Sequence, residues 1–156
     1  MLTGKTEEAV RALEVTKDVV VAAPPEIVFA ALLDQMGPMS EMPDGTPFPM
    51  KIEPWPGGRW FRDLGDNTGH FWGHVQVIKP PGLLEICGPL FMSYPAVNFV
   101  QYRLAAEDVT TRLKVIHKAI GQISDDHREG VVEGWAHELE RVRKLAEERA
   151  GPKRRG

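Results

Sequence analysis

The chain has 156 residues, enough for one domain whose hydrophobic core is stable without metals or disulfides. Its 19 basic and 22 acidic residues give a net charge of −3, which argues against a protein that coats nucleic acid or an anionic membrane. The single cysteine, Cys87, excludes an internal disulfide and a multi-cysteine zinc site. Fifteen glycines and 13 prolines predict many turns, bulges and strand edges.

Neither end of the chain carries a recognisable targeting or membrane segment. The first residues include two glutamates and no apolar stretch, unlike a secretory signal, and no apolar run approaches the roughly 20 residues of a membrane helix. We therefore expect a cytoplasmic protein with no membrane partner. We divide it into an N-terminal extension (1–13), one domain (14–150) and a basic tail (151–156) whose three cations are too few to predict nucleic-acid binding.

The first elements are a strand and a short helix. A cluster of β-branched valines predicts a strand over Glu14–Ala22, and Pro24-Pro25 followed by helically spaced apolar residues predicts a helix over Pro24–Leu33. The next segment is rich in proline and methionine and predicts an irregular loop with a short strand around Met50–Ile52. Its methionines either form a mobile lid over an apolar pocket or fill gaps beneath the loop. These methionines are Met36, Met39, Met42 and Met50.

From Gly57 onward, apolar segments alternate with turns that contain glycine, proline or asparagine, a pattern typical of an antiparallel meander. The expected strands are Arg59–Leu64, Phe71–Ile78, Leu83–Cys87, Ala96–Leu104 and Val109–Lys118. Ser124 then predicts the N-cap of a helix that runs to about Arg149 and stops at Gly151-Pro152. Its apolar stripe is Val131, Trp135, Leu139, Val142 and Leu145/Ala146.

This order of elements predicts an α+β fold: a curved antiparallel sheet of six to seven strands wrapped around a long C-terminal helix, with one or two short helices after the first strand. The C-terminal helix is long enough to cover one face of the sheet, and such an arrangement leaves space between helix and sheet.

Five segments, spread over about residues 15–148, also carry a family resemblance. They are VVAAPPEIVFAAL (Val20–Leu32), WPGGRW (Trp55–Trp60), GHVQVIKPPGLL (Gly73–Leu84), TRLKVIH (Thr111–His117) and EGWAHELER (Glu133–Arg141). Together they resemble the activator of heat-shock protein 90 ATPase homologue-like family, in the START-like (SRPBCC, helix-grip) superfamily. The resemblance implies a hydrophobic cavity between sheet and helix and leaves its contents open.

Strand alternation predicts which side chains face the cavity. Asn98, Tyr102 and His117 fall on the helix-facing side of neighbouring strands, where buried polar groups must bond one another or a ligand. If Trp60 points inward, so does Arg62, and its cation then needs a carboxylate, a ligand anion or the cavity mouth, unless a bulge turns it to solvent beside Asp63. Our hypothesis is that Arg62 binds an acidic group of the ligand. The predicted ligand-binding residues are Trp55, Trp60, Arg62, Phe71, Ile86, Asn98, Tyr102, His117, Trp135 and Leu139.

No metal or cofactor is predicted. His70 and His74 lie four residues apart on a strand, a span of about 13 Å that one metal ion does not bridge. Pro56-Gly57-Gly58 enters a strand and lacks the helix N-terminus that a phosphate site needs.

Three functions stay open on the sequence. The first is non-catalytic binding of a small, largely hydrophobic molecule, such as a lipid. The second is a cyclase- or hydrolase-like enzyme, in which His117 acts as general acid or base and Tyr102 and Asn98 orient the substrate. The third, suggested by the family name, is a chaperone-associated module with an unidentified protein partner.

Overall fold

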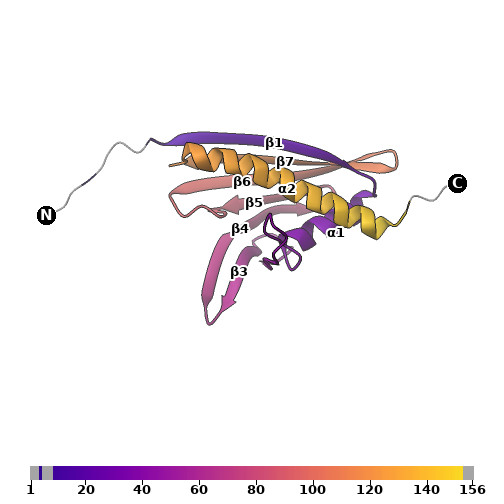
Figure 1. The fold of residues 1–156 in the computed structure, drawn as a ribbon, viewed down its shortest axis with the longest axis horizontal. Coiled ribbons are helices and arrows are strands. Elements are labelled where there is room, and N and C mark those ends of the chain that lie inside the picture. The colour runs from indigo at the N-terminus through magenta and orange to yellow at the C-terminus, as the bar shows by residue number, and fades with distance from the viewer. Residues whose placement is uncertain (1–3, 5–8, 153–156) are drawn as a thin grey trace.

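The computed structural model describes residue 4 and residues 9–152. The elements in chain order are β1 (Arg11–Val21), α1 (Pro25–Met36), β2 (Lys51–Ile52), β3 (Arg59–Gly65), β4 (Thr68–Lys79), β5 (Leu83–Gly88), β6 (Ala96–Glu107), β7 (Thr110–Gly121) and α2 (Asp125–Ala150). The predicted fold class is confirmed, since a curved antiparallel sheet packs against a long C-terminal helix (Figure 1).

The sheet has seven strands in the order β1-β7-β6-β5-β4-β3-β2, and every pair is antiparallel. The chain therefore follows a meander from β2 to β7, and β1 closes the far edge beside β7. Helix α2 lies across one face of the sheet with α1 against its C-terminal half, while the β3–β4 hairpin projects away from α2 (Figure 1). The loop after α1 lies against α2 on the side of the hairpin.

Helix α2 begins and ends as its sequence predicts. The Ser124 side chain accepts a hydrogen bond from the His127 backbone N–H at 3.2 Å, and Gly151 caps the other end with a φ of 79°. The buried residues of the helix follow the predicted stripe: they are Val131, Trp135, Leu139, Val142 and Ala146. In the described part of the chain, neither helix combines the length and apolar character needed to span a bilayer.

Several element bounds differ from the predicted ones. β1 begins at Arg11 instead of Glu14 because Arg11 pairs with Gly121, so part of the predicted N-terminal extension belongs to the sheet. The β6–β7 turn is shorter than predicted, since Glu107 pairs with Thr110 and Asp108 adopts a positive φ of 55°. In the predicted basic tail, the cations at 153–155 lie outside the described residues.

A β-bulge in β4 inverts one predicted face. Trp60 pairs with Gly73 and Phe61 pairs with Phe71, so Trp72 is the extra residue between them. Trp72 is therefore buried, with 8% of its surface exposed, and Phe71 is 41% exposed. The prediction that Phe71 faces the cavity is wrong, because strict alternation along β4 does not anticipate the bulge.

The proline- and methionine-rich segment between α1 and β2 (residues 37–50, hereafter the 37–50 loop) is folded back on itself. Backbone hydrogen bonds join Met50 N to Gly37 O at 2.9 Å, Phe48 N to Ser40 O at 2.8 Å and Met42 N to Thr46 O at 2.8 Å. The segment predicted to be an irregular loop is thus a narrow, hairpin-like excursion whose two ends meet.

Candidate functional site

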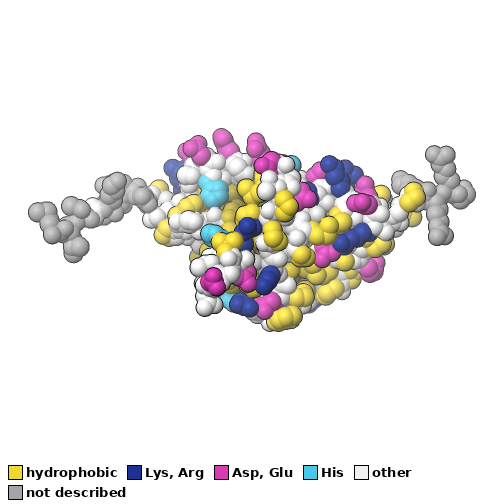
Figure 2. Space-filling model, turned by 60° about the horizontal axis from the view of Figure 1, so that its bottom comes forward, with side chains coloured by type: hydrophobic (Ala, Val, Ile, Leu, Met, Phe, Trp, Pro, Cys, Tyr) yellow, Lys and Arg dark blue, Asp and Glu magenta, His cyan; other side chains and the backbone are white. Residues whose placement is uncertain are grey.

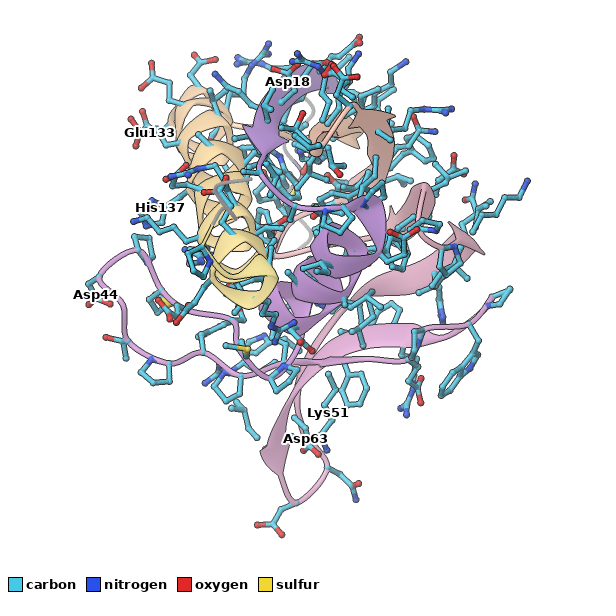
Figure 3. The ribbon with its side chains drawn as sticks, turned by 90° about the vertical axis from the view of Figure 1, so that its right-hand side faces the viewer. Asp18, Asp44, Lys51, Asp63, Glu133 and His137 are labelled. Atoms are coloured by element: carbon cyan, nitrogen blue, oxygen red, sulfur yellow. The ribbon has the colours of Figure 1, made fainter. Side chains whose placement is uncertain are left out.

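A cavity of about 410 Å³ lies between the 37–50 loop and α2, a size typical of small-molecule sites. Its lining residues are Ser40, Glu41, Met42, Pro43, Phe48, Met50, Trp60, Trp72, Phe91, His127, Gly130, Val131, Gly134, Trp135, His137, Glu138 and Arg141. The loop tip that carries Asp44 lies beside α2, near His137 (Figure 3), and His137 Nε2 is 3.2 Å from the Pro43 carbonyl oxygen. The loop therefore forms one wall of the cavity and the helix forms another.

The apolar part of the lining is built from aromatic rings. Trp60 and Trp135 are each only 3% exposed, and Trp60 Nε1 donates to the Met36 carbonyl oxygen at 2.7 Å, which fixes the indole against the end of α1. The Phe91 ring lies 6.2 Å from Trp72 and 6.3 Å from Trp135 between ring centroids. These rings give an apolar ligand a rigid surface with a large contact area.

The mouth of the cavity is also apolar. Met42 and Phe91 line the cavity and yet are about two-fifths exposed, at 43% and 44%. Figure 2 shows hydrophobic side chains among charged ones over the middle of the face that lies at the bottom of Figure 1. Exposed apolar residues that continue into a cavity are typical of a binding site.

Polar groups of the lining are concentrated on α2, and Glu138 is the most perturbed of them. Burial raises the pKa of Glu138 to about 6, although a hydrogen bond from Tyr102 and the charge of Arg141 act in the opposite direction. Tyr102 Oη donates to Glu138 Oε1 at 2.5 Å, and burial beside this carboxylate raises the pKa of Tyr102 well above its usual value. The cavity thus contains a carboxyl group that changes charge close to neutral pH.

Behind the aromatic wall, a second polar cluster is sealed in the core. Trp135 Nε1 donates to His117 Nδ1 at 3.0 Å, so His117 carries its proton on Nε2 and donates it to Asn98 Oδ1 at 2.6 Å. Asn98 Nδ2 in turn donates to the Pro89 carbonyl oxygen at 3.2 Å. Burial, with a smaller effect from the charge of His127, lowers the pKa of His117 to about 4. His117 is therefore neutral at pH 7, with both ring nitrogens engaged.

The structure brings only some of the predicted site residues to the cavity. Trp60 and Trp135 line it. Asn98, Tyr102, His117, Ile86 and Leu139 lie beneath the lining and are at most 2% exposed, so they support the wall from behind. Trp55 lies in the turn before β3 and is 54% exposed, away from the cavity. Phe71 lies on the outer face of β4 and is also away from the cavity. The predictions that Trp55 and Phe71 face the cavity are corrected accordingly.

Arg62 lies next to the cavity wall without lining it. Its guanidinium carbon is 3.6 Å from the centroid of the Phe48 ring, and Phe48 is a lining residue of the 37–50 loop. Arg62 Nη1 is buried and has no hydrogen-bond partner among the described residues. Arg62 keeps the face of Trp60, as alternation predicts, but its cation stacks on the loop that covers that face.

Sequence reasoning missed the polar and glycine positions of the α2 wall. Gly130, Gly134 and Glu138 are spaced four apart and lie beside the apolar stripe, so helical periodicity was the signal that could have found them. Trp72 lines the cavity because of the bulge in β4, and Phe48 lines it because of the course of the 37–50 loop. Neither the bulge nor the course of the loop has a comparable periodic signal in the sequence. Among the described residues, no group of three or more His, Cys, Asp or Glu side chains is placed to hold a metal ion.

No family model and no curated protein matches the chain. Solved structures do match. The chain shares 19% identity with the Zhui aromatase/cyclase from Streptomyces sp. R1128, over 89% of this chain and 96% of that one, with a TM-score of 0.65. It shares 15% identity with an uncharacterised protein from Rhizobium leguminosarum (90% and 99% covered, TM-score 0.67) and 20% with CalU16 from Micromonospora echinospora (88% and 86%, TM-score 0.58).

At these identities the likeness shows the fold alone. The helix-grip fold expected from the sequence is confirmed, because neighbours of this fold align over most of both chains. Membership of the activator family is not shown, and a chaperone-associated role stays a prediction from the sequence.

Proposed function

We propose that the protein binds a small, largely apolar molecule in the cavity between α2 and the 37–50 loop. The observation that supports this proposal best is the composition of the cavity wall, in which Trp60, Trp72 and Trp135 surround about 410 Å³ of space. Apolar walls with a few polar groups on one side are the usual design of small-molecule sites. The neighbours named aromatase/cyclases agree with a fold that accommodates such molecules.

Native mass spectrometry of protein purified from its own host tests the proposal directly, because a retained lipophile would be seen as a mass increment. In vitro, a panel of lipophiles should quench tryptophan emission and raise the melting temperature. The quenching should persist in Trp55→Phe, since Trp55 lies away from the cavity, and should shrink in Trp135→Phe. A broad panel that shifts neither emission nor melting temperature would refute the proposal.

One observation favours a second candidate, a cyclase-like enzyme. Glu138 has a pKa of about 6 and is held by Tyr102 at the edge of an aromatic cavity, which suits a general acid or base. In this version Glu138 acts on the substrate, whereas His117 has no free ring nitrogen. Turnover of a candidate substrate that is lost in Glu138→Gln and kept in His117→Gln would support it, and the reverse pattern would restore the role predicted for His117.

A further inference from the structure

The buried side-chain atoms that lack a hydrogen-bond partner are all found around the 37–50 loop. In the described part of the chain there are four of them: Gln35 Oε1, Arg62 Nη1, Trp72 Nε1 and Arg141 Nε. Buried polar groups are normally paired, so each such atom needs a physical explanation. Their concentration around one loop indicates that the loop covers groups whose hydrogen bonds it does not replace.

Each of the four residues borders the loop. The Arg62 cation stacks on an aromatic ring of the loop, and Trp72 and Arg141 line the cavity together with loop residues. Gln35, which is only 6% exposed, lines a second hollow between α1, α2 and the loop. Arg141 and Pro43 line both spaces, so the loop meets α2 between them.

None of the four unpaired atoms is accessible to a water molecule, so a ligand in the cavity does not reach them in this arrangement. Movement of the loop away from α2 would open a path for water to these groups. The missing hydrogen bonds therefore favour a displaced loop, and they offset part of the packing energy that holds the loop against the helix. Such a balance allows a second position of the loop to be populated.

The loop is bonded mainly to itself. The backbone N–H groups of Met42 and Phe48 donate to carbonyl oxygens of the loop, each at 2.8 Å. Asp44 Oδ1 accepts from the Thr46 N–H at 2.9 Å. Prolines stiffen the segment further, at positions 38, 43, 47 and 49. The loop therefore has the internal bonding of a small folded unit.

Few bonds hold this unit against α2. Among the described residues, His137 Nε2 donates to the Pro43 carbonyl oxygen at 3.2 Å, and Arg149 Nη2 donates to Met39 Sδ at 3.5 Å. Both bonds are exposed, and a thioether sulfur is a weak acceptor. The loop tip, residues 41–47, is exposed throughout, and Figure 3 shows it beside His137. The stronger of the two attachments is thus one hydrogen bond from one histidine.

The two ends of the loop allow it to turn as one piece. Gly37 and Met50 are joined by a backbone hydrogen bond of 2.9 Å, and Pro38 and Pro49 lie directly inside them. Because proline fixes its own φ, rotation is concentrated at Gly37 and Met50, and glycine has the widest choice of backbone angles. Hinges of moving loops are commonly a few residues of this kind at the ends of elements.

We infer that the 37–50 loop is a lid that swings as a folded unit about Gly37 and Met50, with the hydrogen bond from His137 to Pro43 as its latch. The closed position leaves four buried groups unpaired, and the open position hydrates them and exposes the tryptophans of the cavity. The motion does not depend on the proposed function, although it supplies the route by which a ligand would enter.

Acrylamide quenching of tryptophan emission measures the opening without any ligand. Trp55→Phe is the background for every variant, because it removes the exposed indole and leaves the emission of Trp60, Trp72 and Trp135, each at most 8% exposed. His137→Ala breaks the latch and should raise the quenching constant about twofold, as the loss of one exposed hydrogen bond allows.

His74→Ala is the matched control for the latch. The His74 ring is also bonded to a backbone carbonyl oxygen, that of Gly57 at 3.1 Å, and His74 does not line the cavity. This variant should leave the quenching constant unchanged, because its hydrogen bond lies away from the loop.

Gln35→Met tests the same balance from the opposite side. Methionine keeps the length of the side chain and removes the unpaired amide oxygen, so the closed position loses a cost that the open position does not have. The variant should raise the melting temperature and lower the quenching constant about twofold. A static loop would give the first change without the second.

Hydrogen exchange at Met42 and Phe48 shows whether the loop moves as a unit. Their N–H groups are bonded within the loop, so they should exchange no faster in His137→Ala than in the background protein. Faster exchange would mean that the loop unfolds instead of swinging, which overturns the lid. The lid is also overturned unless quenching rises in His137→Ala and falls in Gln35→Met. Neither result changes the outcome of the lipophile panel, which judges the proposed function separately.

Discussion

Helix α2 contributes to two polar clusters that differ in how completely they are satisfied. In the core, His117, Asn98 and Trp135 bond one another, and no part of His117 or Asn98 is exposed. Less than one turn further along the helix, Glu138 has one hydrogen bond, from Tyr102, and opens onto the cavity. Trp135 belongs to both regions, because its N–H faces the core cluster and its ring lines the cavity.

The difference separates a histidine whose hydrogen bonds are all made within the core from a carboxyl group that opens onto the cavity. A buried polar cluster whose donors and acceptors are all paired makes the core rigid and has no hydrogen-bonding capacity left for a ligand. A group with spare hydrogen-bonding capacity beside an open cavity is available for recognition. Of the two titratable groups, only Glu138 has that capacity, even though His117 is the residue type more often associated with catalysis.

The largest expected effect concerns acid stability through His117. Its pKa is about 4 in the folded protein against an ordinary value of 6.5, so the unfolded chain takes up the proton first. The stabilisation is complete above pH 6.5 and should fall by about 3 kcal/mol as the pH drops through 4. Urea unfolding between pH 7 and pH 4 measures this fall.

His117→Gln is the comparison for that experiment, because glutamine offers a donor and an acceptor but does not titrate. Between pH 7 and pH 4, the free energy of unfolding of this variant should therefore fall by about 3 kcal/mol less than that of the wild type. The carboxylates titrate alike in both proteins and cancel. If the free energy of unfolding has the same pH dependence in the wild type and the variant, His117 is not held neutral in a buried, fully hydrogen-bonded cluster.

The effect at Glu138 should be smaller and of opposite sign. Its pKa is raised from 4.5 to about 6, so its contribution to stability is complete below pH 4.5 and is lost as the pH rises through 6. Because the side chain is partly exposed in the cavity, we expect a loss of only about 1 kcal/mol. Glu138→Gln should remove this loss in urea titrations between pH 4.5 and pH 7. A wild-type protein that grows more stable than Glu138→Gln over this range would contradict the assigned environment.

The smallest effect is expected where an aromatic residue lies outside both clusters. Trp55 is 54% exposed, so Trp55→Ala should change the free energy of unfolding by no more than about 0.5 kcal/mol, as surface substitutions usually do. The affinity for a lipophile that binds the wild-type protein, measured by calorimetry, should stay within twofold of the wild-type value. A larger loss of affinity would place Trp55 at the ligand and redraw the boundary of the cavity.

The sequence was sufficient to predict the fold, because the signals that define it are periodic. The α2 stripe, the strand meander and the Ser124 cap all follow from repeating patterns or local turn chemistry. Alternation also placed Asn98, Tyr102 and His117 on the helix-facing side of the sheet, and all three are fully buried. Alternation does not tell whether these side chains bond one another or a ligand, because that depends on partners from distant segments of the chain.

The cavity itself was harder to predict because its walls come from non-periodic parts of the chain. Because of the bulge in β4, the ring of Trp72 points inward and that of Phe71 points outward, the reverse of what strict alternation predicts. Phe48 and Met42 are positioned by the hydrogen bonds of the 37–50 loop, whose course no repeat in the sequence encodes. The α2 positions were accessible in principle, but they are polar or glycine, and a search for an apolar stripe passes over them.

The paired ends of the 37–50 loop have a consequence for how this site evolves. A backbone hydrogen bond joins Met50 to Gly37, so the residues between them form a loop whose two ends meet. This loop contributes one wall of the cavity and little to the sheet. Such an insert can change in length and composition while the junction and the surrounding fold persist. The cavity wall that this loop contributes can therefore change as one unit, independently of helix α2, which forms the facing wall.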